Sequence, residues 1–243
     1  MNKIEKLELM IKECNNIVAF TGAGVSTDSG LKDFRSKDGL YKQKLTYPVE
    51  YLLSHDCFYN NPELFFKYYK ENFNCQNILP NSTHKLLKKL EDINKLKAIV
   101  TQNIDGLHTK AGCKFVYEVH GTIYKNYCIK CHKEYNANKI FNSKNIPKCT
   151  CGGIIKPNVV LYGESLPEKE YTNGLLAISK ADMLIVLGSS LTVYPAASMI
   201  DFFKGKYLVI INNDKTPYDY KADIVINDNL SKISDILINN IKE

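Results

Sequence analysis

The sequence predicts an α/β protein in which helices cover both faces of a parallel sheet and a small cysteine-rich module is inserted. Short apolar runs alternate with segments of helical periodicity along most of the chain, which favours strands joined by helices. Several of these runs end in polar residues, as strands of a parallel sheet do beside a ligand. Residues 124–157 interrupt the alternation with clustered cysteines and no helical periodicity, so we expect a separate module there.

The first half of the chain predicts three helices and two strands. Apolar residues from Ile4 to Cys14 recur at helical spacing, and residues 16–24 (NIVAFTGAG) then form a buried strand that runs into a glycine turn. Helices are expected over residues 61–73 and 81–93, the second opened by a capping serine or threonine. Residues 96–105 (LKAIVTQNID) follow as an apolar strand with a polar exit.

The second half continues the pattern. Residues 181–191 (ADMLIVLGSSL) and 207–214 (YLVIINND) are two more apolar strands with polar exits, and residues 230–241 predict an amphipathic closing helix. Because the carboxyl ends of parallel strands meet at one edge of a sheet, we expect the polar exits of all four strands to line one crevice.

Composition and charge exclude several classes of protein. The 243 residues are 44% hydrophobic and 24% charged, and no apolar run approaches the ~20 residues of a membrane span. The N-terminus carries acidic residues and no apolar signal region, so we expect a cytoplasmic protein. The net charge is +6, but the lysines are spread along the chain, and no specific nucleic-acid partner is expected.

Arg35 is the only arginine among 32 basic residues. It ends the stretch FTGAGVSTDSGLKDFR, which supplies the first two glycines of a G-x-G-x-x-G turn but has Thr27 in the third glycine position. The backbone amides of Gly22–Gly24, the hydroxyls of Ser189 and Ser190, and this guanidinium together suit a diphosphate. Separately, TQNID is equally consistent with a turn stabilised by its own side chains, and GSSL and Asn212 with helix caps.

The four clustered cysteines predict a structural zinc site. Cys128-x-x-Cys131 and Cys149-x-Cys151 are separated by 17 residues, and two such hooks give a closed tetrahedral set of thiolates. CIKCH also matches the attachment pattern of c-type haem, but that interpretation leaves the second hook unexplained. The other four cysteines are expected to be buried free thiols: Cys14, Cys57, Cys75 and Cys113.

His120 is the histidine most suited to catalysis. It ends the strand-like segment FVYEVH and precedes Gly121, which lets another backbone or a ligand approach closely. A neutral imidazole is a natural general base for a hydroxyl near pH 7. We expect His55, His84 and His108 to be partly exposed or hydrogen-bonded structural residues.

Six motifs occur in the order found in sirtuins, the NAD-dependent protein deacylases, and the resemblance covers Ile4 to Ile241. They are GAGVSTDSGLKDFR, TQNIDGLH, His120-Gly121, the four-cysteine module, KPNVVLYGE and GSSL. The resemblance implies a Rossmann-like NAD-binding domain over residues 1–123 and 158–243, with a helical insertion around 40–80. It also implies a zinc-ribbon module over residues 124–157 and a cleft for NAD and an acetyl-lysine protein or peptide.

The resemblance also implies a role for each site residue. His120 would be the general base, with Asn103 as a second catalytic residue, and Val160 and Leu161 would contact an extended peptide substrate. Zinc would be held by Cys128, Cys131, Cys149 and Cys151. NAD would be bound by Ala23, Thr27, Phe34, Arg35, Gln102, Ile104, Asp105, Gly188, Ser189, Ser190, Asn212 and Asp228.

The implied reaction moves no hydride. The acyl oxygen of the modified lysine attacks C1′ of the nicotinamide ribose, nicotinamide leaves, and His120 takes a proton from the ribose hydroxyl that attacks the acyl carbon. Free lysine and O-acetyl-ADP-ribose result. Two other functions remain open at this point: mono-ADP-ribosyl transfer to protein, against which Asn103 and His120 argue, and a zinc-ribbon nucleic-acid module, which lacks the expected aromatic and arginine clusters.

The chain departs from the family pattern in two places, and it also lacks a motif of the desuccinylating relatives. Lys32 stands where a proline is usual, which should loosen the cofactor loop. Tyr162 replaces the commoner phenylalanine, a mild change. The Tyr-x-x-Arg pair of desuccinylating relatives corresponds to Phe66-Lys67-Tyr68-Tyr69, without an arginine, so a preference for neutral acyl groups is expected.

Overall fold

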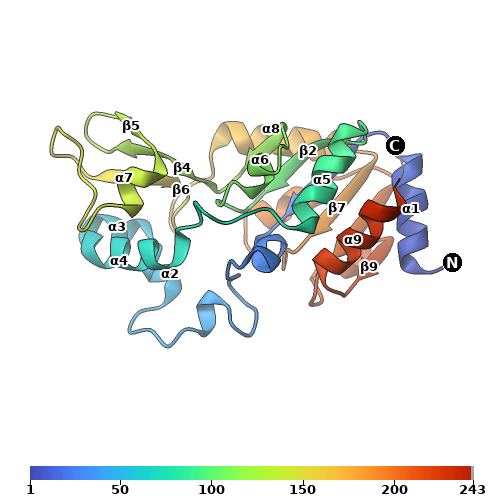
Figure 1. Ribbon diagram of the computed structural model, residues 1–243, viewed down its shortest axis with the longest axis horizontal. Helices are drawn as coiled ribbons and strands as arrows, with labels where there is room; N and C mark the ends of the chain where they lie inside the picture. The colour runs from blue at the N-terminus through green and yellow to red at the C-terminus, as the bar shows by residue number, and fades with distance from the viewer. Residues whose placement is uncertain (242–243) are drawn as a thin grey trace.

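The larger part of the protein is built on a six-stranded parallel sheet. The computed structural model describes residues 1–241, and the strands lie in the order β3-β2-β1-β7-β8-β9. Figure 1 shows this sheet and its helices at one end of the molecule, with both chain termini. The strands are β1 (Ile17–Thr21), β2 (Leu96–Thr101), β3 (Val116–Glu118), β7 (Met183–Leu187), β8 (Tyr207–Ile211) and β9 (Ile224–Ile226).

Helices cover the sheet on both faces because its strands are apolar on both sides. In β1, Ile17 and Ala19 pack into one core with α1 (Lys3–Glu13), α5 (Ser82–Asp92) and α9 (Leu230–Asn240). Val18 and Phe20 point the other way and pack with α8 (Glu168–Lys180) and the 3-10 helix η3 (Ala196–Phe202). This alternation along a fully buried strand is what a covered parallel sheet requires. The predicted α/β fold class is confirmed.

A third core joins the cysteine-rich module to the helices of residues 49–73. The antiparallel strands β5 (Glu134–Tyr135), β4 (Gly121–Cys128) and β6 (Ile155–Val159) form a small sheet. Tyr69 stacks on Phe65 at 5.5 Å between ring centroids and on Phe141 at 5.7 Å. The helices around this core are α2 (Val49–Leu52), α3 (His55–Asn60), α4 (Pro62–Phe73) and α7 (Ala137–Phe141). The domain boundaries at residues 123 and 158 stay a prediction.

The predicted cap of the helix over residues 81–93 is wrong. The N-cap of α5 is Asn81, whose Oδ1 accepts a hydrogen bond from the amide of Thr83 at 2.9 Å. Its Nδ2 donates to the carbonyl of Val25 at 2.8 Å. An asparagine side chain can accept from the helix and donate elsewhere, which a serine at this position would do less well. The cap thereby ties α5 to the turn after β1.

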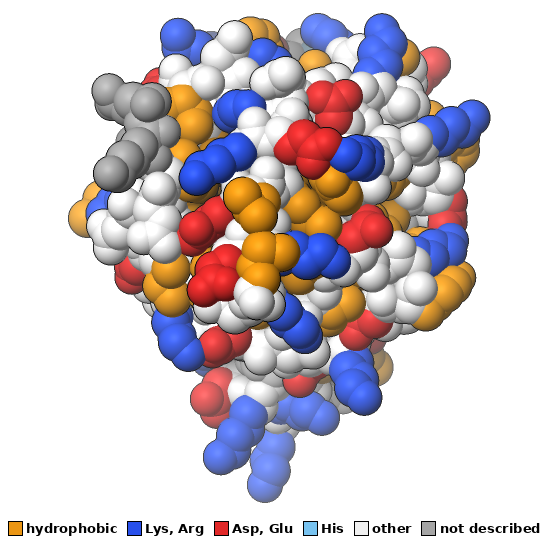
Figure 2. Space-filling model, turned by 90° about the vertical axis from the view of Figure 1, so that its right-hand side faces the viewer, with side chains coloured by type: hydrophobic (Ala, Val, Ile, Leu, Met, Phe, Trp, Pro, Cys, Tyr) orange, Lys and Arg blue, Asp and Glu red, His pale blue; other side chains and the backbone are white. Residues whose placement is uncertain are grey.

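The surface carries charged side chains of both signs. On the face shown in Figure 2, lysine side chains are interspersed with acidic ones over most of the area. Within residues 1–241, no helix combines the length and the apolar character needed to cross a membrane. The four cysteines outside the cluster are buried free thiols, as predicted.

Candidate active site

Polar side chains from neighbouring strand exits meet at the carboxyl edge of the large sheet. Gln102, after β2, donates from Nε2 to the hydroxyl oxygen of Ser189, after β7, at 2.8 Å. Because β1 lies between these two strands, the bond passes over the end of β1. Below it, the amide of Gln102 donates to the carbonyl of Thr21 at 2.9 Å. The predicted convergence of these strand exits is therefore confirmed.

Three buried polar side chains form the floor of this edge. Ser26, in the 3-10 helix η1 (Ala23–Ser29), donates its hydroxyl to Asp105 at 2.6 Å. Asn103 donates from Nδ2 to the Ser26 hydroxyl oxygen at 3.3 Å. The second carboxylate oxygen accepts the amide of Leu107 at 2.9 Å. Burial raises the pKa of Asp105, and the hydrogen bonds from Ser26 and Leu107 oppose that shift. Ser26 belongs to the motif GAGVSTDSGLKDFR, but its sequence position gave no signal of its contact with Asp105.

The glycine turn after β1 does not present the amides that the sequence suggested. The amide of Gly22 donates to Leu187 O at 3.0 Å, and that of Gly24 to Gly188 O at 2.9 Å. A Cβ on Gly22 would lie 2.8 Å from the oxygen of Gly188, and one on Gly24 would lie 2.9 Å from its Cα. The glycines are required because the turn packs directly on the β7 exit, so these two amides are unavailable to a diphosphate.

His120 is held in one orientation by the same strand exit. Its Nδ1 lies 3.0 Å from the carbonyl oxygen of Gln102. A carbonyl only accepts, so Nδ1 carries the proton and the neutral ring keeps its lone pair on Nε2. Burial lowers the pKa of His120, and the Gln102 hydrogen bond opposes this. The side chain is therefore prepared as a neutral base.

The segment that follows β6 is a turn. β6 ends at Val159, and the amide of Val160 donates to His120 O at 2.9 Å. Leu161 is buried, with its amide 3.0 Å from Glu164 Oε2 and its carbonyl accepting the Glu164 amide at 2.9 Å. The buried ammonium of Lys156 lies 3.0 Å from the same carboxylate oxygen. Both backbone groups of Leu161 therefore already have a hydrogen-bond partner within this turn.

The loop from Leu31 to Tyr41 carries Arg35 on the surface. The carboxylate of Asp33 accepts the amides of Arg35 at 3.1 Å and Ser36 at 2.9 Å. The Arg35 guanidinium carbon lies 5.4 Å from the ring centroid of Tyr41. Within residues 1–241, Arg35 forms no ion pair. Its planar group is therefore oriented by stacking, with its donors left for a ligand.

Most of the remaining candidates lie around the exits of β7, β8 and β9, whereas Thr27 and Ile104 follow β1 and β2. Ser190 bonds the hydroxyl of Thr192 at 2.9 Å, and Asn212 donates to Asp214 O at 2.8 Å. Asp228 is already occupied, by the ammonium of Lys232 at 2.7 Å and by the Asn229 amide. Gly188 has φ of 58°, and a Cβ there would lie 2.5 Å from the nitrogen of Val25. Thr27 donates to Gly24 O, and Ile104 accepts from the Ile123 amide.

The four cysteines fit a zinc ion. All four sulfur atoms lie within 4.8 Å of one another, with Cys128–Cys151 and Cys131–Cys149 at 3.5 Å. Tetrahedral zinc with bonds of about 2.3 Å needs sulfur atoms roughly 3.8 Å apart. Tyr135 donates its hydroxyl to the sulfur of Cys149 at 3.0 Å. Four thiolates complete the coordination and leave no open position, as in structural sites.

Two buried histidines lie beneath the site, each hydrogen-bonded through one ring nitrogen. His84 and His108 are both buried, with ring centroids 4.9 Å apart. His108 Nε2 lies 3.0 Å from the hydroxyl of Thr21, at the end of β1. His84 Nε2 and His108 Nδ1 have no hydrogen-bond partner among the described residues. They are therefore not exposed, and each keeps one ring nitrogen without a partner in the described part of the chain. Helices α5 and α6 (Leu107–Lys110) bring the two rings together, which the sequence does not reveal.

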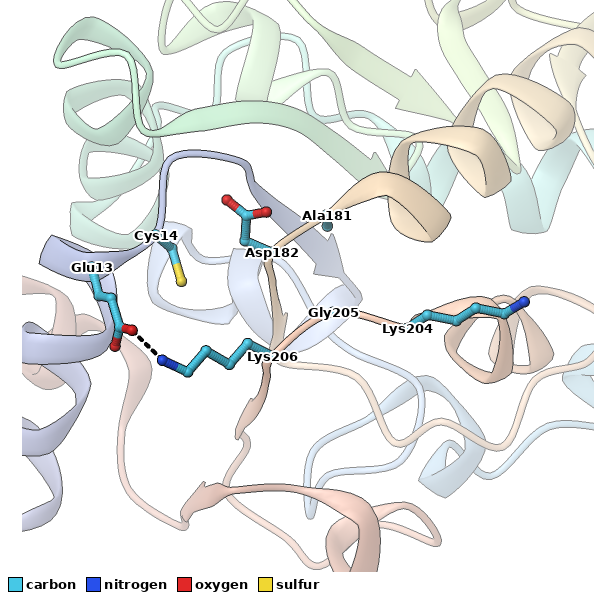
Figure 3. A pocket seen from close by; sticks show the side chains of 7 residues that line it. All are labelled: Glu13, Cys14, Ala181, Asp182, Lys204, Gly205 and Lys206. Atoms are coloured by element: carbon cyan, nitrogen blue, oxygen red, sulfur yellow. Dashed lines mark hydrogen bonds and ion pairs between the residues drawn. The ribbon is translucent and has the colours of Figure 1, made fainter.

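An open cavity at the opposite edge of the large sheet is not part of this site. It lies where β7 and β8 begin, and Figure 3 shows its lining residues. The ammonium of Lys206 pairs with Glu13, and Asp182 accepts the amides of Asn15 and Asn16. Lys204 extends away from the other charged groups (Figure 3). Most of the charges are thus already paired.

Comparisons with known proteins agree on one family. The model of the Sir2 family matches residues 22–195. The NAD-dependent protein deacetylase of Clostridium perfringens is 54% identical over 236 residues, which are 96% of this chain and 97% of that protein. The NAD-dependent protein deacetylase of Clostridium acetobutylicum is 50% identical over 98% of this chain and 99% of that protein.

Solved structures give the same result. A Sir2 complex with a p53 peptide and NAD⁺ is 38% identical, with a TM-score of 0.87 and 98% of each chain covered. A Sir2 variant with a deacetylated p53 peptide and 3′-O-acetyl ADP-ribose is 36% identical, with a TM-score of 0.91 and the same coverage.

Proposed function

The chain belongs to the Sir2 family, and on that premise we infer that it is an NAD-dependent protein deacetylase. It transfers the acetyl group of acetyl-lysine to the ADP-ribose part of its co-substrate NAD, with release of nicotinamide and O-acetyl-ADP-ribose. Its substrates are acetyl-lysine proteins or peptides. The eight free cysteines support a reducing, cytoplasmic location.

One residue supports this function above all, because Gln102 contacts both halves of the proposed site. Its carbonyl accepts from His120 Nδ1, and its side chain donates to Ser189 at the β7 exit. We propose that His120 acts as general base through Nε2 on a ribose hydroxyl of the bound co-substrate. The same backbone that orients this base would also help to hold the nucleotide.

We propose that Asp105 and Asn103 bind the nicotinamide half of NAD. The Asp105 carboxylate is buried and is kept in a fixed position by Ser26 and the Leu107 amide, so it can accept hydrogen bonds from the carboxamide. Among the described residues, the side chain of Asn103 bonds only to Ser26. Gln102 and Ile104 would complete this side.

The loop after β1 and the other strand exits would bind the rest of the nucleotide. The guanidinium of Arg35 forms no ion pair within residues 1–241 and would bind phosphate oxygens. Ala23, Thr27 and Phe34 would lie beside it. On the adenosine side we propose Gly188, Ser189, Ser190 and Asn212. Asp228 is the weakest candidate, because Lys232 and Asn229 already bind its carboxylate.

Val160 is the better of the two proposed peptide contacts. Val160 is partly exposed and its amide bonds to His120 O, whereas Leu161 is buried with both backbone groups hydrogen-bonded. A zinc ion bound by the four thiolates would supply no catalysis, because it has no open coordination position. Its role would be to fix the small sheet that leads to this segment.

The function is tested with an acetyl-lysine peptide incubated with and without NAD, with nicotinamide release and deacetylation followed together. Activity should require NAD, and His120→Ala should lower kcat/KM by at least about 100-fold. His55→Ala, a change at an exposed histidine, is the matched control. Deacetylation without NAD, full activity of His120→Ala, or ADP-ribosylated protein in place of O-acetyl-ADP-ribose would contradict the proposed reaction.

A further inference from the structure

Two tyrosine hydroxyls join the loop of Arg35 to the segment of Val160. The hydroxyl oxygens of Tyr41 and Tyr162 lie 2.5 Å apart, although the residues are 121 positions apart in the sequence. Tyr162 is 38% exposed, so it lies at the surface rather than inside a core. Phenylalanine, which commonly stands at this position in the family, would keep the ring but lose the bond.

On one side, Tyr41 holds the loop that carries the proposed phosphate ligands. Its amide donates to Phe34 O at 3.0 Å, and its ring lies 5.6 Å from that of Phe34 and 5.4 Å from the Arg35 guanidinium. Leu31, Phe34 and Tyr41 all pack against the core that the cysteine-rich module shares with the helices of residues 49–73. The position of this loop therefore depends on that core as well as on β1.

On the other side, Tyr162 has a fixed backbone. Its amide donates to Leu53 O at 3.0 Å, and its carbonyl accepts the amide of His55 at 2.9 Å. It lies within the turn from Leu161 to Glu164, two residues after Val160. Because the Tyr162 backbone is held by these hydrogen bonds, its hydroxyl offers the loop of Arg35 a fixed partner.

We propose that the Tyr41–Tyr162 hydroxyl pair is a positioning contact that holds the loop of Phe34 and Arg35 in the orientation that binds NAD. The assignment of NAD to this loop rests on the proposed function. The contact acts on binding, since neither hydroxyl is placed on a reacting atom. A loop held in advance loses less conformational freedom when the nucleotide binds, so removing the bond should weaken NAD binding.

The first test is the Kd for NAD, measured by calorimetry on the free protein, where no turnover occurs. Tyr41→Phe and Tyr162→Phe should each raise the Kd about three- to tenfold, the effect of one neutral hydrogen bond. The double variant should be no weaker than either single variant, because all three lack the same bond. Tyr59→Phe, which removes an exposed hydroxyl, should bind NAD normally.

The second test follows the loop without NAD. Lys32, Arg35 and Lys37 are exposed trypsin sites, and cleavage there should be faster in both single variants than in the wild type or Tyr59→Phe. Equal cleavage rates with an unchanged Kd, or additive losses in the double variant, would overturn the proposal. If the wild type does not bind NAD, the proposed function fails, whereas the cleavage rates still decide whether the hydroxyl pair holds the loop.

Discussion

The hydroxyl of Ser26 donates a 2.6 Å hydrogen bond to the carboxylate of Asp105. This bond joins the turn after β1 to the turn after β2, and both side chains are buried, at 2% and 6% exposed. Burial raises the pKa of Asp105, while this bond and the Leu107 amide favour the charged form. The carboxylate is thus kept as a fixed acceptor at the centre of the site.

Ser26→Ala should weaken this acceptor. Without the hydroxyl, the buried carboxylate loses one of its donors, so the pKa of Asp105 should rise further and the free energy of unfolding should fall by about 1–2 kcal/mol. We expect the Kd for NAD to rise about tenfold. Calorimetry and thermal unfolding measure both effects. Ser29→Ala is the matched control, because its hydroxyl has no partner among the described residues, and equal behaviour of the two variants would contradict the prediction.

Arg35→Lys should weaken NAD binding without destabilising the fold. Lysine keeps the charge but loses the planar fork and its stacking on Tyr41, so KM for NAD should rise about tenfold. Arg35 is exposed, and the melting temperature should stay unchanged. Steady-state kinetics with Lys37→Ala as a loop control test this. Unchanged NAD kinetics would mean that the single arginine reflects codon usage.

The enzyme should prefer neutral acyl groups. Helix α4 contains no arginine, so it presents no guanidinium for an acyl carboxylate. Phe66 and Tyr69 are buried, and the Tyr68 hydroxyl is bonded to Gln43. The ammonium of Lys70 is occupied by the carbonyls of Ser143 and Asn145. A succinyl-lysine peptide should therefore react at least about tenfold more slowly than the acetyl peptide of the same sequence, since an unpaired charge is costly to bury. Equal rates would refute this preference.

Loss of zinc should unfold more than the small sheet. Cys131→Ser removes one of four ligands, and the variant should bind zinc weakly and melt at a lower temperature. Because α2, α3 and α4 share the core of that sheet, helical signal should be lost as well. Zinc analysis and circular dichroism, with zinc added back to chelated wild type as the control, measure this. Full zinc content and an unchanged melting temperature in Cys131→Ser would contradict it.

Stability should fall as pH drops below about 6.5 because of His84 and His108. Burial lowers the pKa of His84 to about 4, and burial followed by the charge of His84 lowers that of His108 well below 6.5. Between the folded and unfolded values the unfolded chain binds more protons, so stability rises with pH there, by up to about 1.4 kcal/mol per pH unit for each histidine. This stabilisation is complete above the unfolded pKa.

Urea unfolding between pH 5 and 7 measures this dependence. His84→Gln should flatten it, because one of the imidazoles whose pKa burial lowers no longer gains a proton on unfolding. His55→Gln, at an exposed position, should leave the slope as it is in the wild type. A slope unaffected by His84→Gln would show that other groups are responsible.

The sheet and the zinc ligands could be predicted because their signals are local. Each strand of the sheet's centre is a short apolar run, and Cys128 and Cys131 are near neighbours in the chain. Contacts between distant segments could not be predicted in this way. The amides of Gly22 and Gly24 were expected to face a ligand, yet they bond to the exit of β7, which is more than 160 residues away.

Periodicity along the chain was enough to place the strand exits at one edge, because side-chain period and strand direction follow from neighbouring residues. Partners across the fold had to come from packing. Ser26 meets Asp105, His84 meets His108, and Tyr41 meets Tyr162, each pair brought together by elements far apart in the sequence. Hydrogen bonds are sensitive to differences of a few tenths of an ångström in donor–acceptor distance, and those distances are set by how the cores of the protein pack.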